Sequence, residues 1–118
     1  MALTFYDQAG TAVAYSQDEE HIYLFSGRAA GYIRGRNVYG YDGGHIGVFV
    51  NGWVWDHGGL AVFFTERARG GPMRPVRSVK PVKSVRSVRP VKSVRAVAPV
   101  ASVRSLGWSR QSGERFFG

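Results

Sequence analysis

The first 64 residues contain an eleven-residue segment that repeats four times. Each copy opens with an aliphatic residue or Phe, continues with an aromatic residue, and has glycine at its sixth position. The copies span residues 5–15, 22–32, 38–48 and 54–64, and their sixth-position glycines are Gly10, Gly27, Gly43 and Gly59. Tight hairpin turns require positive φ, which glycine adopts without steric cost. The repeat therefore predicts four β-hairpins, each turning at its glycine.

Eight antiparallel strands follow from these hairpins and from the turns that join them, of which Asn51-Gly52 is the strongest signal. We expect strands near residues 3–7, 11–16, 21–25, 29–34, 37–41, 45–50, 53–57 and 60–65. A two-residue turn at Gly10 would place Tyr6 opposite Val13, an aromatic–aliphatic pair that stabilises a sheet face, and the other hairpins repeat this register. The meander could close into a barrel, or four hairpins could radiate from a pseudo-fourfold axis. Because closure removes exposed edges, we expect an all-β, closed, eight-stranded antiparallel meander with pseudo-fourfold symmetry.

Further glycine–aromatic motifs accompany the repeat: Ile22-Tyr23-Leu24-Phe25-Ser26-Gly27, Gly31-Tyr32-Ile33, His45-Ile46-Gly47, Gly52-Trp53 and Gly70-Gly71-Pro72, followed by a tail with Lys-Pro-Val. In these motifs the chain resembles the bacterial four-fold β-flower family, as far as about Trp108. The resemblance implies a fold of four hairpins. It implies no catalytic residue at any position of this chain, so function has to be argued from the residues themselves.

The chain from Pro72 to Gly107 reads as twelve triplets. The first position is Pro, Ser or Ala, and the middle position is Val in all but Met73 and Leu106. The third position is Lys or Arg in nine of the twelve, the exceptions being Ala98, Ala101 and Gly107. Neither a helix nor a strand has a period of three, whereas polyproline II does and tolerates proline. We therefore expect a polyproline-II-like rod with a valine edge, a Pro/Ser edge and a cationic edge.

The valine edge is too much apolar surface to leave in water, so we expect it to be buried against the head, against other tails, or both. At ~3.1 Å per residue a straight tail would be roughly 110 Å long, and we expect that such a rod cannot lie on its own head. Both faces of the head are also rich in apolar residues, which favours an interaction surface. We therefore expect a homo-oligomer with tail contacts at Val82, Val85, Val88, Val91 and Val94.

The charge of the chain is divided unevenly. Residues 1–64 carry three arginines and six acidic residues, a net charge of −3, whereas residues 65–118 carry thirteen basic residues against Glu66 and Glu114, a net charge of +11. A cationic tail can bind phosphates without sequence preference, so nucleic acid or an anionic surface is a possible partner. The candidate polyanion-binding residues are Arg77, Lys80, Lys83, Arg86, Arg89, Lys92 and Arg95.

The chain divides into four segments on this reading. Residues 1–65 form the head, 66–71 a Gly-rich linker, 72–107 the basic tail, and 108–118 an aromatic anchor containing Trp108, Phe116 and Phe117. There is no cysteine, which excludes disulfides and thiolate metal sites. No apolar run approaches the ~18 residues of a membrane-spanning helix, and the start lacks the pattern of a secretory signal. We expect a soluble, cytoplasmic protein.

The residues that support catalysis or metal binding in other proteins form no pattern here. The Asn51-Gly52 turn places His57 opposite Ile46, so we expect His45 and His57 to diverge, and no metal site is predicted at them or at His21. Asp42 and Asp56 adjoin glycine turns, where aspartate is common, and Glu66 has no acid–base partner. The ring of Tyr6, Tyr23, Tyr39 and Trp55 could bind a cation or stack on a base, although core packing is the simpler explanation.

We therefore expect neither an enzyme nor a cofactor. The sequence favours a self-assembling structural or interaction module. The alternative is a non-specific polyanion binder that acts through the basic tail.

Overall fold

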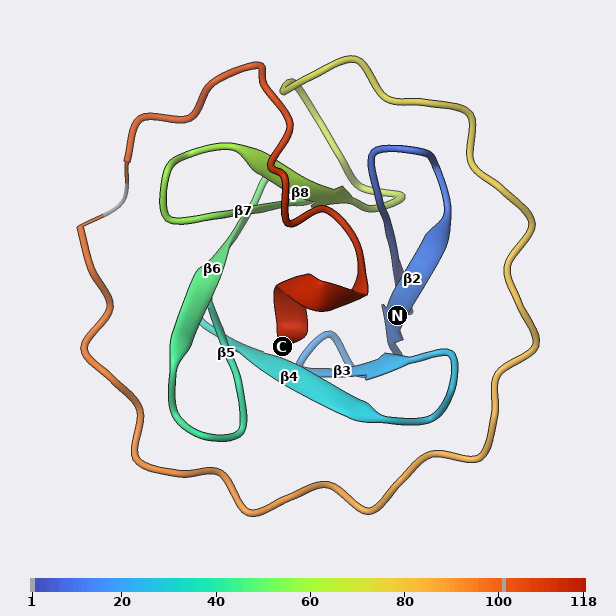
Figure 1. Cartoon of the computed structure of the whole chain (residues 1–118), viewed down its shortest axis with the longest axis vertical. Helices are drawn as coiled ribbons and strands as arrows, with labels where there is room; N and C mark the ends of the chain where they lie inside the picture. The colour runs from blue at the N-terminus through green and yellow to red at the C-terminus, as the bar shows by residue number, and fades with distance from the viewer. Residues whose placement is uncertain (1, 101) are drawn as a thin grey trace.

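The computed structural model describes residues 2–100 and 102–118; Met1 of the predicted head and Ala101 of the predicted tail lie outside the described residues. Eight antiparallel strands form a closed barrel in chain order (Figure 1). The strands are β1 Leu3–Tyr6, β2 Ala12–Ser16, β3 His21–Leu24, β4 Ala29–Arg34, β5 Asn37–Tyr39, β6 His45–Val50, β7 Trp53–Trp55 and β8 Ala61–Phe64. The barrel closes where Tyr6 of β1 pairs with Phe64 of β8. The all-β, closed, four-hairpin fold predicted from the repeat is confirmed.

The hairpin turns are longer than predicted. Asp7 accepts a hydrogen bond from the Gly10 amide and donates its own amide to the Thr11 carbonyl, at 2.9 and 3.0 Å. The Asp7 carboxylate caps this turn by accepting from the amides of Ala9 and Thr11. The expected two-residue turn is therefore wrong, although the repeat glycines do have positive φ.

The longer turn shifts each hairpin by one residue through a bulge. The aromatic residue of each unit pairs with the residue before the expected one, as Tyr6↔Ala12, Tyr23↔Ala29, Tyr39↔His45 and Trp55↔Ala61. As a result Val13, Ile46 and Val62, which were expected on the aromatic face, pack with the interior cluster.

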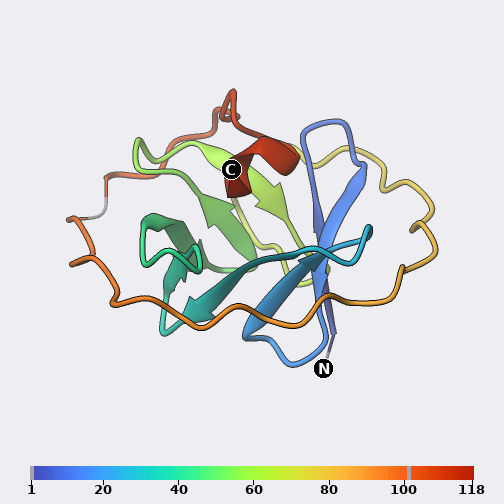
Figure 2. The ribbon, with the colours of Figure 1, turned by 60° about the horizontal axis from the view of Figure 1, so that its bottom comes forward.

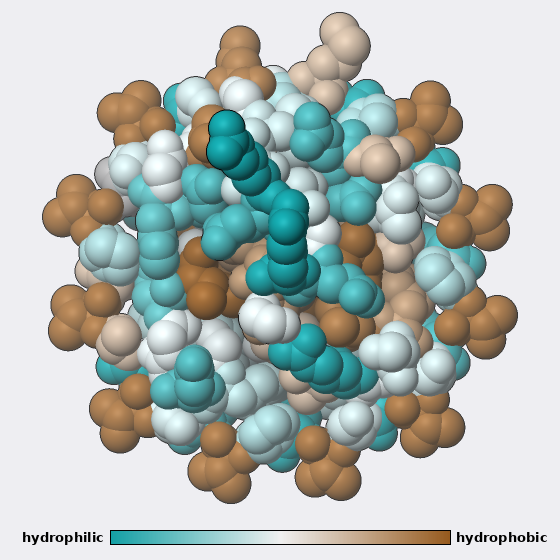
Figure 3. All heavy atoms as spheres, in the orientation of Figure 1, coloured by the Kyte–Doolittle hydropathy of each residue, from teal (hydrophilic) through white to brown (hydrophobic). Residues whose placement is uncertain are grey.

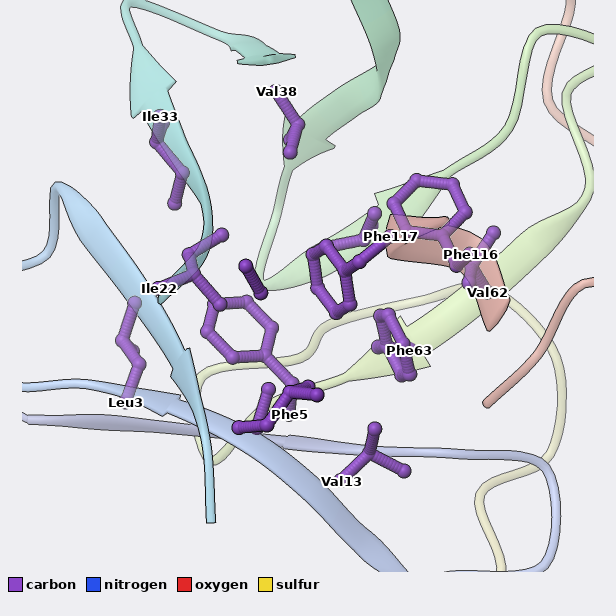
Figure 4. Packing of buried hydrophobic residues seen from close by; sticks show 14 residues of the cluster. Leu3, Phe5, Val13, Ile22, Ile33, Val38, Val62, Phe63, Phe116 and Phe117 are labelled. Atoms are coloured by element: carbon purple, nitrogen blue, oxygen red, sulfur yellow. The ribbon is translucent and has the colours of Figure 1, made fainter. Parts of the chain in front are cut away.

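The barrel interior is filled by aliphatic and Phe side chains, including Phe5 and Phe63 (Figure 4). A short 3-10 helix, η1 Glu114–Phe117, lies over the mouth of the barrel and points Phe116 and Phe117 into it (Figures 1 and 4). The ring of Phe117 stacks on that of Phe63 with centroids 5.5 Å apart. The end of the chain thus completes the core of the head.

The tail runs round the outside of the barrel as a ring (Figures 1 and 2). It contains neither helix nor strand from Met73 to Val100. The molecule measures 36 × 35 × 25 Å, and a circle of that width has a circumference of roughly 110 Å, the length expected of the tail. The expectation that the tail cannot lie on its own head is wrong, because the tail is curved around the head rather than straight.

Candidate functional site

The tail is fixed to the head by backbone hydrogen bonds that recur every nine residues. The amides of Ser78, Ser87, Ala96 and Ser105 donate to the carbonyls of Gly10, Gly27, Gly43 and Gly59, at 2.8 to 3.0 Å. Three triplets of the tail therefore correspond to one unit of the head. Additional bonds from the Ser84 and Ser93 amides reach the carbonyls of Phe25 and Tyr41.

The repeat glycine allows the tail backbone to approach this closely. At Gly43 a Cβ would collide with the carbonyl oxygen of Val94. The equivalent carbonyls of Val76, Val85 and Val103 stand in the same place at the other three units. Sequence reasoning explained these glycines by the turn alone, and this second requirement was missed.

The cationic edge of the tail faces the aromatic outer surface of the head. An arginine lies over the leading aromatic ring of each unit, 5.2 to 5.9 Å from the centroid: Arg77 over Tyr6, Arg86 over Tyr23, Arg95 over Tyr39 and Arg104 over Trp55. Lys83 and Lys92 lie 4.6 Å from the ring centroids of Tyr15 and Tyr32. The four leading rings do not converge on one cage; each contacts a cation of the tail instead.

Two of the candidate polyanion-binding residues also form ion pairs, one with the linker and one with the head. Lys80 Nζ lies 3.6 Å from Glu66 Oε2, and Lys92 Nζ lies 3.1 Å from Glu20 Oε2. Arg89 lines a groove of the tail with Tyr23. All seven candidates except the half-buried Lys92 remain exposed, so these side chains cover the head without losing contact with water.

The valine edge points away from the head. We call the middle residues of the triplets, from Met73 to Leu106, the valine rim. Its members from Met73 to Val103 are 91 to 97% exposed, and these include the expected contact residues Val82, Val85, Val88, Val91 and Val94. Figure 3 shows their side chains projecting around the perimeter of the molecule.

The chain's own head therefore does not cover the valine edge, which corrects one of the expected arrangements. The reason is that the other two edges of the tail make the contacts with the head. The Ser/Ala amides reach carbonyls of the head, and Lys and Arg rest on aromatic faces while their charges stay hydrated. The valines occupy the remaining direction.

His45 and His57 lie side by side, contrary to the expectation that they diverge. His45 Nδ1 is 2.9 Å from His57 Nε2, and the two rings stack with centroids 5.1 Å apart. The expectation failed because regular β6–β7 pairing ends at Val48↔Trp55, so the register cannot be extended to His57. Burial lowers the pKa of His45, and the neighbouring His57 lowers it further. A cavity of about 460 Å³ opens beside the pair, between the head and the tail segment around Pro99.

The acidic residues mostly serve turns and the ends of strands. Asp42 and Asp56 accept hydrogen bonds from amides of their own turns, as expected. Glu66 Oε1 accepts from the Thr4 amide at 2.7 Å. His21 is held by Asp18, with Nδ1 2.7 Å from the carboxylate. Across residues 2–100 and 102–118, no three His, Asp or Glu side chains gather closely enough to hold a metal ion by themselves.

A family model described as "4-fold beta flower protein" matches residues 3–117 of the chain. No curated protein and no solved structure matches the chain significantly. None of the helical structure in the described part of the chain is long and apolar enough to cross a membrane.

Proposed function

The chain belongs to the 4-fold beta flower family, and on that premise we propose that it is a non-enzymatic module that self-assembles through its valine rim. The observation that carries this proposal is the direction of the rim: nearly every middle residue of the triplets is more than 90% exposed. Soluble monomers rarely expose apolar side chains in such a regular array unless a partner covers them.

The chemistry of the rim suits an interface. Full burial of one valine side chain contributes about 1.5–3 kcal/mol, so a few valines on each partner supply the energy of a weak association. Valine is β-branched and has few rotamers to lose when it is buried. The rim also surrounds the molecule (Figure 3), so one copy can contact more than one neighbour. Assembly in the plane of the ring is the arrangement that this geometry favours.

Sedimentation of the full chain over a series of concentrations tests the proposal. We expect species heavier than the 13.0 kDa monomer, and we expect the variant Val85→Ser/Val88→Ser/Val91→Ser to shift the distribution toward monomer. The matched variant with Ile at the same positions keeps the rim apolar and should retain the association. A wild-type chain that stays monomeric at high concentration, or a serine variant that associates equally well, would reject the proposal.

Non-specific polyanion binding is the second candidate function. It is supported by the exposure of the tail cations, which rest on rings without being buried. Replacing Lys80, Lys83 and Arg89 with Gln should weaken binding to a labelled DNA duplex and flatten its dependence on salt, while leaving self-association unchanged. The serine variant of the rim should do the opposite, so the two functions can be separated. Equal DNA binding by the Gln variant would exclude this candidate.

A further inference from the structure

The third unit of the head differs in sequence from the other three at two positions. The stretch of tail that runs beside it also differs from the other stretches. His45 stands where the other head units have alanine, at Ala12, Ala29 and Ala61. Val48 stands where the others have an aromatic residue, at Tyr15, Tyr32 and Phe64. In this unit the aromatic ring on which a tail lysine would rest is therefore missing.

The third nine-residue stretch of the tail departs in a matching way. Ala98 stands at the position of Lys80 and Arg89, and Ala101 at the position of Lys83 and Lys92. Two cations are thus absent from the sequence of the stretch that passes this head unit. The cavity beside His45 and His57 lies here. Its lining includes Val97, Pro99 and Val100 of this stretch.

The two histidines are oriented by a third side chain. His45 Nε2 lies 2.9 Å from Asn37 Oδ1. Because an amide oxygen only accepts, this contact assigns the proton to His45 Nε2 and leaves the lone pair of Nδ1 facing His57. His57 Nε2 lies 2.9 Å from His45 Nδ1 and donates its N–H to that lone pair. His57 is exposed, so its ring has room to turn.

We propose that His45 Nδ1 and His57 Nε2 together bind a divalent transition-metal ion of the zinc, nickel or copper class, with water as the remaining ligands. Imidazole nitrogen suits these metals and binds zinc at about 2.0–2.1 Å. Two nitrogens of a tetrahedral zinc site lie about 3.3–3.4 Å apart, so the two rings, now 2.9 Å apart, need to separate by only about 0.4 Å, which a turn of the exposed His57 ring supplies. The metal takes the place of the hydrogen bond between the two rings, and His57 binds it as the neutral tautomer that carries its proton on Nδ1.

The surroundings support a cation at this position. Ala98 stands where the other stretches have Lys80 and Arg89, so this position brings no positive charge that would repel the ion. Asn37 supplies the hydrogen bond to the second ring nitrogen that metal-binding histidines normally have. Asp56 also lines the cavity, and its Oδ1 accepts hydrogen bonds from the amides of Gly58 and Leu60.

Titration of the full chain with zinc alone tests the site, using calorimetry for affinity and the histidine ring signals in NMR spectra for location. We expect one zinc per chain, with the signals of His45 and His57 shifting together. His45→Ala restores the residue of the other three units and is therefore expected to fold. Asn37→Ala removes only the hydrogen-bond partner of His45 and should weaken zinc binding about 10-fold to 100-fold. His45→Ala and His57→Ala each remove a metal ligand, so each should weaken zinc binding by more than this.

His21→Ala is the matched control, because His21 is the histidine outside the pair and has the carboxylates of Asp18 and Glu20 beside it. This variant should bind zinc as the wild type does. Unchanged affinity in a folded His45→Ala variant, loss of binding in His21→Ala, or no binding by the wild type would each overturn the proposal.

Discussion

At Gly43 the backbone has a φ of 91°, and the carbonyl oxygen of Val94 occupies the space where a Cβ would stand. The Gly43 carbonyl also accepts the Ala96 amide. One residue thus forms the hairpin turn and receives the tail. A side chain at this position would disturb both.

The variant Gly43→Ala should therefore lose more stability than Gly35→Ala. Both residues have positive φ, where alanine costs about 1–2 kcal/mol. Gly35 has no atom near its Cβ position, whereas alanine at position 43 must also displace the tail. We expect an additional loss of about 1 kcal/mol, the value of one net hydrogen bond, in the free energy of unfolding measured with urea. Equal losses in the two variants would show that the tail does not dock at Gly43.

The contact between His45 and His57 could not be predicted from the sequence. Strand alternation places His45 and His57 on opposite faces, but the β6–β7 pairing ends at Val48↔Trp55, before it reaches them. The signal that could have drawn attention to the site is the repeat itself, since His45 stands where the other three units have alanine. That comparison identifies an unusual unit, but the contact with His57 depends on loop geometry that the repeat does not specify.

At the scale of elements, η1 acts as a plug for the barrel. Phe116 and Phe117 are 5% and 9% exposed and belong to the interior cluster. Phe117→Ala should destabilise the chain by about 3–5 kcal/mol, because it removes a large buried ring and leaves a cavity. Leu106→Ala, an exposed position near the end of the tail, should change stability by no more than about 0.5 kcal/mol. Urea unfolding of both variants measures the contrast, and similar values would mean that η1 does not complete the core.

The turn between β2 and β3 should make the head sensitive to acid. Burial of Asp18 opposes its ionisation, but hydrogen bonds from the His21 side chain and from the His21 and Glu20 amides outweigh it and lower the pKa of Asp18 well below its ordinary value. A carboxylate with a lowered pKa in the folded state stabilises the fold above its unfolded pKa of about 3.9, and this contribution is lost as the pH falls further.

Asp18→Asn should therefore reduce stability near neutral pH and have a smaller effect at about pH 2 to 3. The free energy of unfolding of both chains, measured across this range, gives the comparison. The matched variant is Asp42→Asn, which removes a turn aspartate whose carboxylate accepts a hydrogen bond from the Gly44 amide. If the difference between wild type and Asp18→Asn did not change with pH, the hydrogen bonds of Asp18 would not be responsible.

Most elements could be predicted because each depends on a local pattern. The strands follow from glycine turns and alternating apolar residues, and closure follows from the cost of open edges. The hairpin register could not be obtained this way, because a glycine with positive φ fits both a two-residue turn and a longer turn that ends in a glycine bulge. The longer turn forms even at the second hairpin, where Leu24 stands in the place of Asp7. The path of the tail was also missed. A period of three defines three edges, but which edge faces the head depends on where the aromatic rings of the barrel lie.

At the scale of the whole molecule, head and tail are complementary. The head carries aromatic rings and a net negative charge on its residues, and the tail carries cations at the spacing of those rings. Each cation–π contact at an exposed position contributes about 0.5–1 kcal/mol, so the tail is held by many weak contacts rather than a few strong ones. Such a ring leaves the valine rim outside, where it is available for association.

Residue-resolved amide exchange along the tail tests this arrangement most directly. If the tail encircles the head, the amides of Ser78, Ser87, Ala96 and Ser105 should exchange slowly, since each donates to a carbonyl of the head. Their protection should recur every nine residues. Uniformly fast exchange from Met73 to Leu106, at the rate of a free peptide of the same sequence, would contradict the encircling tail and with it the outward valine rim.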